Sequence, residues 1–383
     1  MAYLRNSTIN LLNLHYGLHS VAMNAGGVFF AVFLLKAGVS ATAVLGALAM
    51  ILGGRFCARP LVLAFGKRLG IKPLLVFCAV TSALQYPLLA RVHGIDVRLL
   101  ELCIASSISD AFYWTSYHAY FASLGDEEHR GHQISAREAL ASVVGIVAPL
   151  IGGWALVALG PIVAFGSVGV VQMLSALPLL GTPNVRVAMR VEGAFRASLA
   201  GFVLFAADGW IASGYVFVWQ ISLFLLLGSS FTAFGGAMAA TALVGAGAGL
   251  LLGRHIDAGH GRRAVWLAFG VLAATILLRA AVRTPALAIL ANAAGALVGC
   301  LYIPTLMTAV YNLAKRSPCV LRFHFMAEGA WDLGCGGGCL AAAALTAVGA
   351  PLMVGVLLSL GGAVTALVVL RRYYARSAVP ASI

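Results

Sequence analysis

Residues 181–198 read GTPNVRVAMRVEGAFRAS and form the longest polar connection in this chain of 383 residues. The stretch contains four charged side chains and lies at the middle of the sequence. On either side, apolar runs alternate with short loops, and about 20 apolar residues are what a helix needs to cross a bilayer. The polar stretch therefore predicts a cytoplasmic linker, 182–198, between two helical halves at 1–181 and 199–383.

The overall composition excludes an ordinary soluble fold. Hydrophobic residues make up 61% of the chain, charged residues make up 10%, and the mean hydropathy is +0.97. Soluble chains are roughly 25% charged. Because a helix satisfies its own backbone hydrogen bonds in lipid, these values predict an all-α integral membrane protein. The net charge of +13 does not indicate a nucleic-acid partner, since the basic residues are scattered and form no patch with aromatic side chains.

The apolar runs predict twelve transmembrane helices, at residues 11–35, 41–64, 73–91, 98–123, 136–158, 161–181, 199–226, 230–252, 264–282, 285–313, 322–347 and 350–370. With both termini in the cytoplasm, only five of the 25 Lys and Arg residues fall on the outer side: Lys36, Arg91, Arg98, Arg279 and Arg283. This bias obeys the positive-inside rule and supports an even number of helices. We expect a multi-pass protein of the bacterial inner (plasma) membrane.

The two halves resemble each other in sequence. FLLKAGVSATAVLGAL from Phe33 is similar to FLLLGSSFTAFGGAM from Phe224, which aligns Gly38 with Gly228. A spacing of about 190 residues predicts a parallel repeat of two pseudo-symmetric six-helix bundles, an architecture found in one large class of transporters.

A loop motif follows the eighth expected helix and reads GRHIDAGHGRR, residues 253–263. It resembles the loop signature of the major facilitator superfamily, in which a glycine and an aspartate precede a further glycine and paired basic residues. The sequence departs from that signature because glycines follow Asp257 at two and four positions instead of three. The counterpart in the first half, residues 59–72, lacks the aspartate altogether.

Two further stretches carry the same resemblance: DEEHRG, which contains Arg130, and GIVAPLIGG at residues 145–153. The resemblance covers essentially the whole chain. It implies alternating access to a substrate held near the midplane between the halves, and a chain that works as a monomer. It also implies a conformational latch formed by Arg130, Asp257, Arg262 and Arg263.

The energy source is expected to be an ion gradient, because the chain contains no GxxxxGK[ST] nucleotide-binding loop. HExxH is also absent, and no constellation of nucleophile, base and orienting group is recognisable. We therefore predict neither an enzyme nor a cofactor, and protons are the expected coupling ion.

Ionisable side chains inside the expected helices are the main clue to a site, because a charge at bilayer depth is costly and normally faces a cavity. The segment 98–123 carries five polar or aromatic side chains on one helical face, which favours a cavity wall: Asp110, Tyr113, Trp114, Tyr117 and His118. The alternative is that the aromatic rings pack between helices. Segment 11–35 carries His15 and His19 four residues apart, with Asn24 beyond them. Segment 199–226 carries Asp208, Trp219 and Gln220.

Segment 322–347 is the most unusual and begins RFHFMAEGAWDLGCGGGC. His324, Glu328 and Asp332 follow one another at steps of four residues, so they share a face. They could relay protons or bind substrate, and imidazole and carboxylate are also ligands for transition metals. A third interpretation is a structural network in which Arg322 or Arg316 neutralises Glu328 near the inner surface.

The predicted function is therefore proton-coupled secondary transport of a small polar or amphipathic solute. Asp110, Asp208, Glu328 and Asp332 are the proton-coupling candidates. The substrate or pathway candidates are His15, His19, Asn24, Tyr113, Trp114, Tyr117, His118, Trp219, Gln220 and His324. Two alternatives stay open: a transition-metal ion transporter that uses His15, His19, His324, Glu328 and Asp332, and a non-transporting membrane receptor or scaffold.

Overall fold

The computed structural model describes residues 6–124, 130–186, 191–256 and 261–377. Within its helices, the side chains of residues 122, 130–136, 138, 139, 250, 252–256, 261 and 262 are also left undescribed. The described chain is mostly helical and contains no strand.

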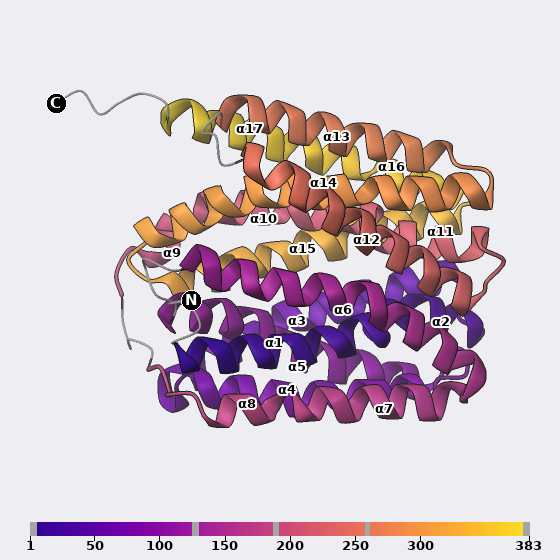
Figure 1. Ribbon diagram of the computed structural model, residues 1–383, viewed down its shortest axis with the longest axis horizontal. Coiled ribbons are helices and arrows are strands. Elements are labelled where there is room, and N and C mark those ends of the chain that lie inside the picture. Colours follow the sequence, from indigo (N-terminus) through magenta and orange to yellow (C-terminus); the bar gives the residue numbers. More distant parts are fainter. Residues whose placement is uncertain (1–5, 125–129, 187–190, 257–260, 378–383) are drawn as a thin grey trace. The chain divides into compact units, whose positions relative to one another are not determined.

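The helices follow one another with short connections (Figure 1). They are α1 (Ser7–Ala25), η2 (Gly27–Phe29), α2 (Phe30–Lys36), α3 (Ala41–Leu69), α4 (Ile71–Leu89), α5 (Val97–Leu124), α6 (Arg130–Ala158), α7 (Gly160–Leu174), α8 (Ala176–Leu180), α9 (Ala194–Ala197), α10 (Leu199–Ala212), η3 (Ser213–Val218), α11 (Trp219–Leu226), α12 (Phe231–Ile256), α13 (Gly261–Ala281), α14 (Pro285–Arg316), α15 (Val320–Ala347), α16 (Leu352–Leu357) and α17 (Ser359–Ser377). Four of the expected spans are broken helices. The breaks lie at η2, at η3, between α7 and α8, and between α16 and α17.

Ten of these continuous or broken helices in the described chain are long and apolar enough to cross a membrane. Aliphatic side chains such as Val157 and Ile162 are exposed on them, as expected for contact with lipid. Helices α5 and α15 have 28 residues each but are not among the ten. These two helices contain the polar stripes of the sequence. The chain is an integral multi-pass membrane protein, and the total of twelve spans stays a prediction.

The chain divides into two compact units. The first unit comprises Met1–Val191 and Ser229–Ala239, and the second comprises Glu192–Gly228 and Ala240–Ile383. The beginning of α12 therefore belongs to the first unit and the rest of α12 to the second.

Close helix packing in the first unit depends on glycines of α6. A Cβ atom at Gly152 would overlap the backbone carbonyl of Ala25, and one at Gly153 would lie 2.6 Å from the carbonyl oxygen of Phe231. In turn, Gly235 of α12 faces the carbonyl of Pro149. The glycine and proline pattern at residues 145–153 thus lets α1 and α12 approach α6 at backbone distance.

The second unit is built in the same way around α10 and α15, which pack against each other (Figure 1). Gly209 of α10 faces the backbone carbonyl of Trp331, and Gly334 of α15 faces that of Ala206. A side chain at either glycine would overlap the carbonyl opposite. The two backbones are therefore in direct contact, as small residues permit between membrane helices.

The turns at the two aligned glycines have the same local structure. Gly38 has a φ of 88° and Gly228 a φ of 68°, a region that favours glycine. Two residues later, Ser40 caps the next helix by accepting a hydrogen bond from the Ala43 amide at 3.2 Å. Ser230 accepts one from the Ala233 amide at the same distance. The sequence similarity therefore reflects a shared turn and helix cap.

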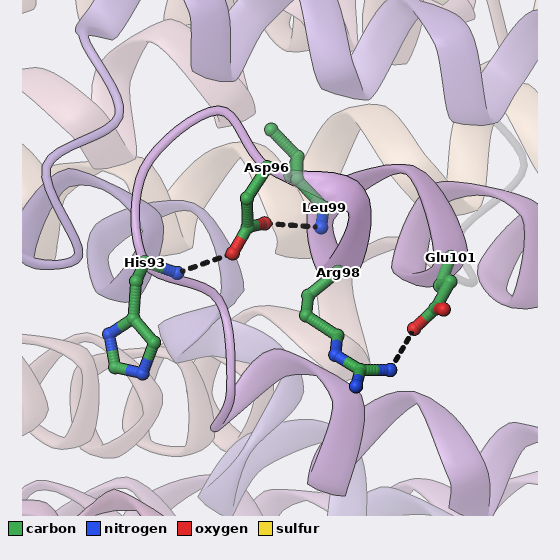
Figure 2. A network of polar contacts seen from close by, with 5 residues as sticks. All are labelled: His93, Asp96, Arg98, Leu99 and Glu101. Atoms are coloured by element: carbon green, nitrogen blue, oxygen red, sulfur yellow. Dashed lines mark hydrogen bonds and ion pairs between the residues drawn. The ribbon is translucent and has the colours of Figure 1, made fainter.

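A further cap begins α5, and Figure 2 shows its polar contacts. The Asp96 carboxylate accepts hydrogen bonds from the backbone amides of Leu99, at 2.9 Å, and His93, at 3.2 Å. One turn on, Arg98 donates to Glu101 at 2.7 Å in an exposed ion pair. The Leu99 amide, and then that of His93, holds the pKa of the Asp96 carboxyl below its usual value, because these amides stabilise the ionised form.

This cap predicts a pH-dependent contribution to stability. Because the pKa of Asp96 is lower in the folded state, the cap stabilises the fold above the unfolded-state pKa of about 3.9, and that stabilisation is lost as the pH falls through the folded-state value. We expect Asp96→Ala to lower the melting temperature at pH 6 and the deficit to shrink below the unfolded-state pKa. Thermal unfolding of the purified protein over this pH range measures it. Asp96→Asn, which caps without titrating, is the control; equal deficits at all pH values for Asp96→Ala would contradict the prediction.

Candidate functional site

His15 lies on α1 in the first unit and is fully buried. Its Nδ1 is 2.7 Å from the backbone carbonyl oxygen of Ser175. A carbonyl oxygen only accepts, so Nδ1 carries the hydrogen. In the neutral ring Nε2 is then an acceptor, and the Tyr113 hydroxyl, 3.3 Å away, donates to it. The surrounding groups thus select one tautomer of His15.

His19 lies one turn further along α1 and is also buried. Its Nδ1 is 3.0 Å from Oε1 of Gln172, whose amide nitrogen donates to the Ala79 carbonyl at 3.4 Å. This second bond orients the Gln172 amide, so Nδ1 of His19 is again the donor. Its Nε2 is buried and has no hydrogen-bond partner among the described side chains. This ring nitrogen is free to accept a hydrogen bond or a proton.

Aromatic rings of α5 extend from this histidine pair. The His19 ring stacks on Tyr113 with a centroid separation of 4.0 Å, and Tyr113 stacks on Tyr117 at 5.7 Å. The rings of Trp114 and His118 stack at 5.8 Å. The face that the sequence pattern predicted therefore brings α1 and α5 together in the first unit through ring contacts.

Asp110 and Asn24 are the remaining candidates of the first unit. Asp110 is half-buried on α5, one turn before Trp114. The Asn24 side chain donates to the carbonyl of Ser20 in its own helix at 2.9 Å.

The sequence patterns did not identify Arg137, which lies on α6 beside the same aromatic cluster. Its guanidinium carbon is 5.0 Å from the Tyr16 ring centroid and 5.4 Å from that of Phe121. Nη1 also lies 3.5 Å from the Tyr117 hydroxyl. A cation over aromatic rings is stabilised by the negative ring faces. The only earlier sign was a basic residue near a helix start, which the charge bias across the membrane already explained.

In the second unit, Asp208 of α10 joins three helices. Tyr302 of α14 donates from its hydroxyl to Oδ1 at 2.8 Å, and Trp331 of α15 donates from Nε1 to Oδ2 at 3.0 Å. Both carboxylate oxygens accept, as an ionised carboxylate does. The Tyr302 hydroxyl can reverse its role when the carboxylate gains a proton, whereas an indole N–H only donates. Tyr302 can therefore form a hydrogen bond with either protonation state of Asp208, whereas Trp331 remains a donor in both.

The stripe on α15 faces the interior of the second unit. His324 and Asp332 are each 1% exposed, and Glu328 is 7% exposed. Arg322, on the same helix, is also buried, and its Nη1 lies 3.3 Å from the sulfur of Cys319. The steps of four residues thus place all three candidates in the core.

Among the described residues, no group of three or more His, Cys, Asp or Glu side chains is arranged to hold a metal ion. His15 and His19 of the first unit use their Nδ1 atoms in hydrogen bonds to protein groups. The described residues therefore provide no set of ligands that would support the hypothesis of a transition-metal substrate.

Trp219 starts a second polar chain in this unit. Its Nε1 donates to Oδ1 of Asn292 at 2.9 Å, and the Asn292 amide donates to Thr241 at 2.7 Å. Gln220 is half-buried beside it on α11. Trp219 also contacts Arg279, one of the basic residues expected on the outer side of the membrane.

The expected latch lies largely outside the described residues. Asp257 is not described, and neither are the side chains of Arg130 and Arg262. Arg263 is exposed at the start of α13.

The fold is that of the transporters of the major facilitator superfamily, and the sequence resemblance to them is confirmed at the level of the fold. The chain is similar to the crystal structure of the human organic anion transporter MFSD10 (TETRAN), with a TM-score of 0.64 and 15% identity over 95% of this chain and 99% of that one. It is also similar to the nucleoside transporter NupG, with a TM-score of 0.67 and 11% identity over 96% of this chain and 99% of that one. No protein-family model matches the chain, and no curated protein matches it in sequence.

Proposed function

We propose that this protein is a secondary active transporter that moves a small polar or amphipathic solute by alternating access. The observation that carries the proposal is a transporter fold combined with buried ionisable side chains in both units. The two similar solved structures cover nearly the whole chain and are transporters of an organic anion and of nucleosides. In this proposal two pseudo-symmetric six-helix bundles, 1–181 and 199–383, are joined by the linker 182–198 and hold substrate near the bilayer midplane.

The proposed driving force is a proton gradient. Asp208, Asp110, Glu328 and Asp332 are carboxylates within helices, where each ionised group is costly and a change of protonation is coupled to its surroundings. Asp208 is the strongest candidate, because Tyr302 can donate to the ionised form and accept from the protonated form. His19, with its free Nε2, is the strongest candidate for a substrate contact in the first unit.

The proposed setting is a bacterial inner membrane with both termini in the cytoplasm, as the charge bias indicates. A single chain is the proposed working unit, as the family resemblance implies. The proposed latch consists of Arg130, Asp257, Arg262 and Arg263.

Flux measurements in proteoliposomes test the proposal. With an inward proton gradient, we expect uptake of at least one of three labelled probes, uridine, hippurate or glucose, above protein-free liposomes, and loss of accumulation when a protonophore dissipates the gradient. Probe uptake that ignores the protonophore would exclude proton coupling. A folded protein that moves none of a broad solute panel would favour the receptor or scaffold alternative.

A further inference from the structure

Arg279 belongs to α13 but directs its guanidinium into the core of the second unit. The residue is 4% exposed and lies two positions before the end of its helix. Its Nη1 donates to the backbone carbonyl of Tyr215 at 2.6 Å. A long basic side chain at a helix end normally extends outward, so that its charge stays in water. The inward direction of the Arg279 side chain is therefore unfavourable unless other groups stabilise its charge.

A change in helix geometry and a glycine make room for this guanidinium. Tyr215 lies within η3, a π-helical turn at Ser213–Val218, and such turns occur frequently at functional sites. Gly295 of α14 is also adjacent to the guanidinium, and a Cβ atom there would overlap Nη2 of Arg279. Gly295 is ten residues past Pro285, so the guanidinium lies at a depth of roughly 15 Å along α14, at about 1.5 Å per residue.

Two aromatic rings enclose the cation. The guanidinium carbon is 4.0 Å from the Tyr215 ring centroid and 4.8 Å from that of Trp219. Both rings are themselves fixed: the Tyr215 hydroxyl donates to the Gly295 carbonyl at 3.2 Å, and Trp219 donates to Asn292. The rings and the carbonyl favour a positive charge but do not neutralise it.

The balancing anion is missing from the described protein. No described carboxylate forms an ion pair with Arg279, whose neighbours are the Tyr215 carbonyl and the rings of Tyr215 and Trp219. Its Nε is buried and has no hydrogen-bond partner among the described residues. A buried charge is costly unless it is paired, and a guanidinium binds a carboxylate through two parallel N–H donors.

From this geometry we propose that Arg279, Tyr215, Trp219 and Gly295 form an anion-binding site for the carboxylate of the transported solute. Nε and Nη2 are the two donors of the fork, and Nη1 stays on the Tyr215 carbonyl. The aromatic rings hold the guanidinium plane, and the missing side chain of Gly295 leaves room for Nη2. This inference rests on the proposed transport function and narrows its substrate class to organic anions.

Measuring ligand binding to the purified protein tests the site independently of transport. The probes are acetate, benzoate and indole-3-acetate, each paired with its uncharged amide, and the readout is the melting temperature across a concentration series. We expect at least one carboxylate to raise the melting temperature while its amide does not. Arg279→Gln is expected to weaken the apparent affinity at least tenfold, and Arg279→Lys to weaken it less, since lysine keeps the charge but not the fork. Arg283→Gln is the matched control, because Arg283 is exposed near the same helix end and bonds only to backbone carbonyls.

The outcomes separate a binding role from a structural one. If Arg279 merely supports η3, Arg279→Gln lowers the melting temperature of the unliganded protein and leaves the carboxylate affinity unchanged, which overturns the proposal. No carboxylate shift in the wild-type protein overturns it as well. Should Arg279→Gln not fold, Gly295→Ala keeps the charge but displaces the guanidinium, because the added Cβ atom would overlap Nη2. It is expected to weaken carboxylate binding, and unchanged affinity there overturns the site. Absence of flux in proteoliposomes with carboxylate binding intact would instead refute transport and retain the site.

Discussion

Gly334→Ala is expected to prevent folding of the second unit, whereas Gly337→Ala, three residues further along the same helix, is expected to be tolerated. At Gly334 the added methyl group would overlap the backbone carbonyl of Ala206, which cannot move without displacing α10. At Gly337 the methyl group would lie 3.6 Å from the Trp210 ring, an ordinary contact distance. Inserting a methylene into a packed core costs about 1–3 kcal/mol, and a backbone obstacle places Gly334→Ala at or above the upper end of that range.

The measurement is the yield of monodisperse protein in detergent and its melting temperature, with both variants prepared in parallel. Their helix propensities rise equally, since alanine replaces glycine in each. A Gly334→Ala protein that melts with the wild type would show that α10 and α15 are not in backbone contact.

Asp208→Asn is expected to abolish uphill accumulation of solute while leaving the protein folded and exchange down a gradient intact. An asparagine amide can accept from Trp331 through its oxygen and donate to the Tyr302 hydroxyl through its nitrogen, so it mimics a protonated carboxyl. The three-helix contact is then kept, but the position no longer binds and releases a proton. A fall of at least tenfold in accumulation corresponds to about 1.4 kcal/mol or more of lost coupling.

Proteoliposomes with and without a proton gradient provide both readouts. The matched control is Asp96→Asn, the same substitution at the cap that begins α5, which should leave accumulation unchanged. Accumulation at the wild-type level in Asp208→Asn would transfer the coupling role to another carboxylate, and loss of exchange together with accumulation would indicate a substrate contact instead.

Helix positions were predictable because they depend on properties that accumulate along a single segment. A bilayer-length apolar run specifies a helix from its own side chains, and the observed helices begin and end within several residues of the expected spans. The alignment of Gly38 with Gly228 also predicted a structural fact, since both glycines occupy the same kind of turn before a serine cap. Such turns are local, so their residues can be recognised in isolation.

The contacts between distant segments were not predictable in this way. The periodicity of α5 and α1 indicated which faces carry polar side chains, but not that His19 stacks on Tyr113 or that Ser175 selects the His15 tautomer. Asp208 was a candidate for its position alone, and its partners Tyr302 and Trp331 lie 94 and 123 residues away. No single-helix pattern contains that pairing.

Arg279 was missed for a different reason. A basic residue near a helix end is the ordinary sign of membrane topology, and this explanation was sufficient until the direction of the side chain was known. No local sequence pattern marks the π-helical turn at Tyr215, and Gly295 is one glycine among 44. Only the fold reveals that these three residues meet.

The polarity of α5 and α15 also bears on how the protein is synthesised. A carboxylate at the centre of a helix opposes its insertion by about 2.5–3.5 kcal/mol, so neither helix is expected to leave the translocation channel for lipid as readily as its neighbours. Each packs on helices made before it, α5 on α3 and α4, and α15 on α10. These partner helices are synthesised first, so each polar helix can pack on protein when it leaves the translocation channel. Insertion of the two helices therefore depends on partners that are already in the membrane.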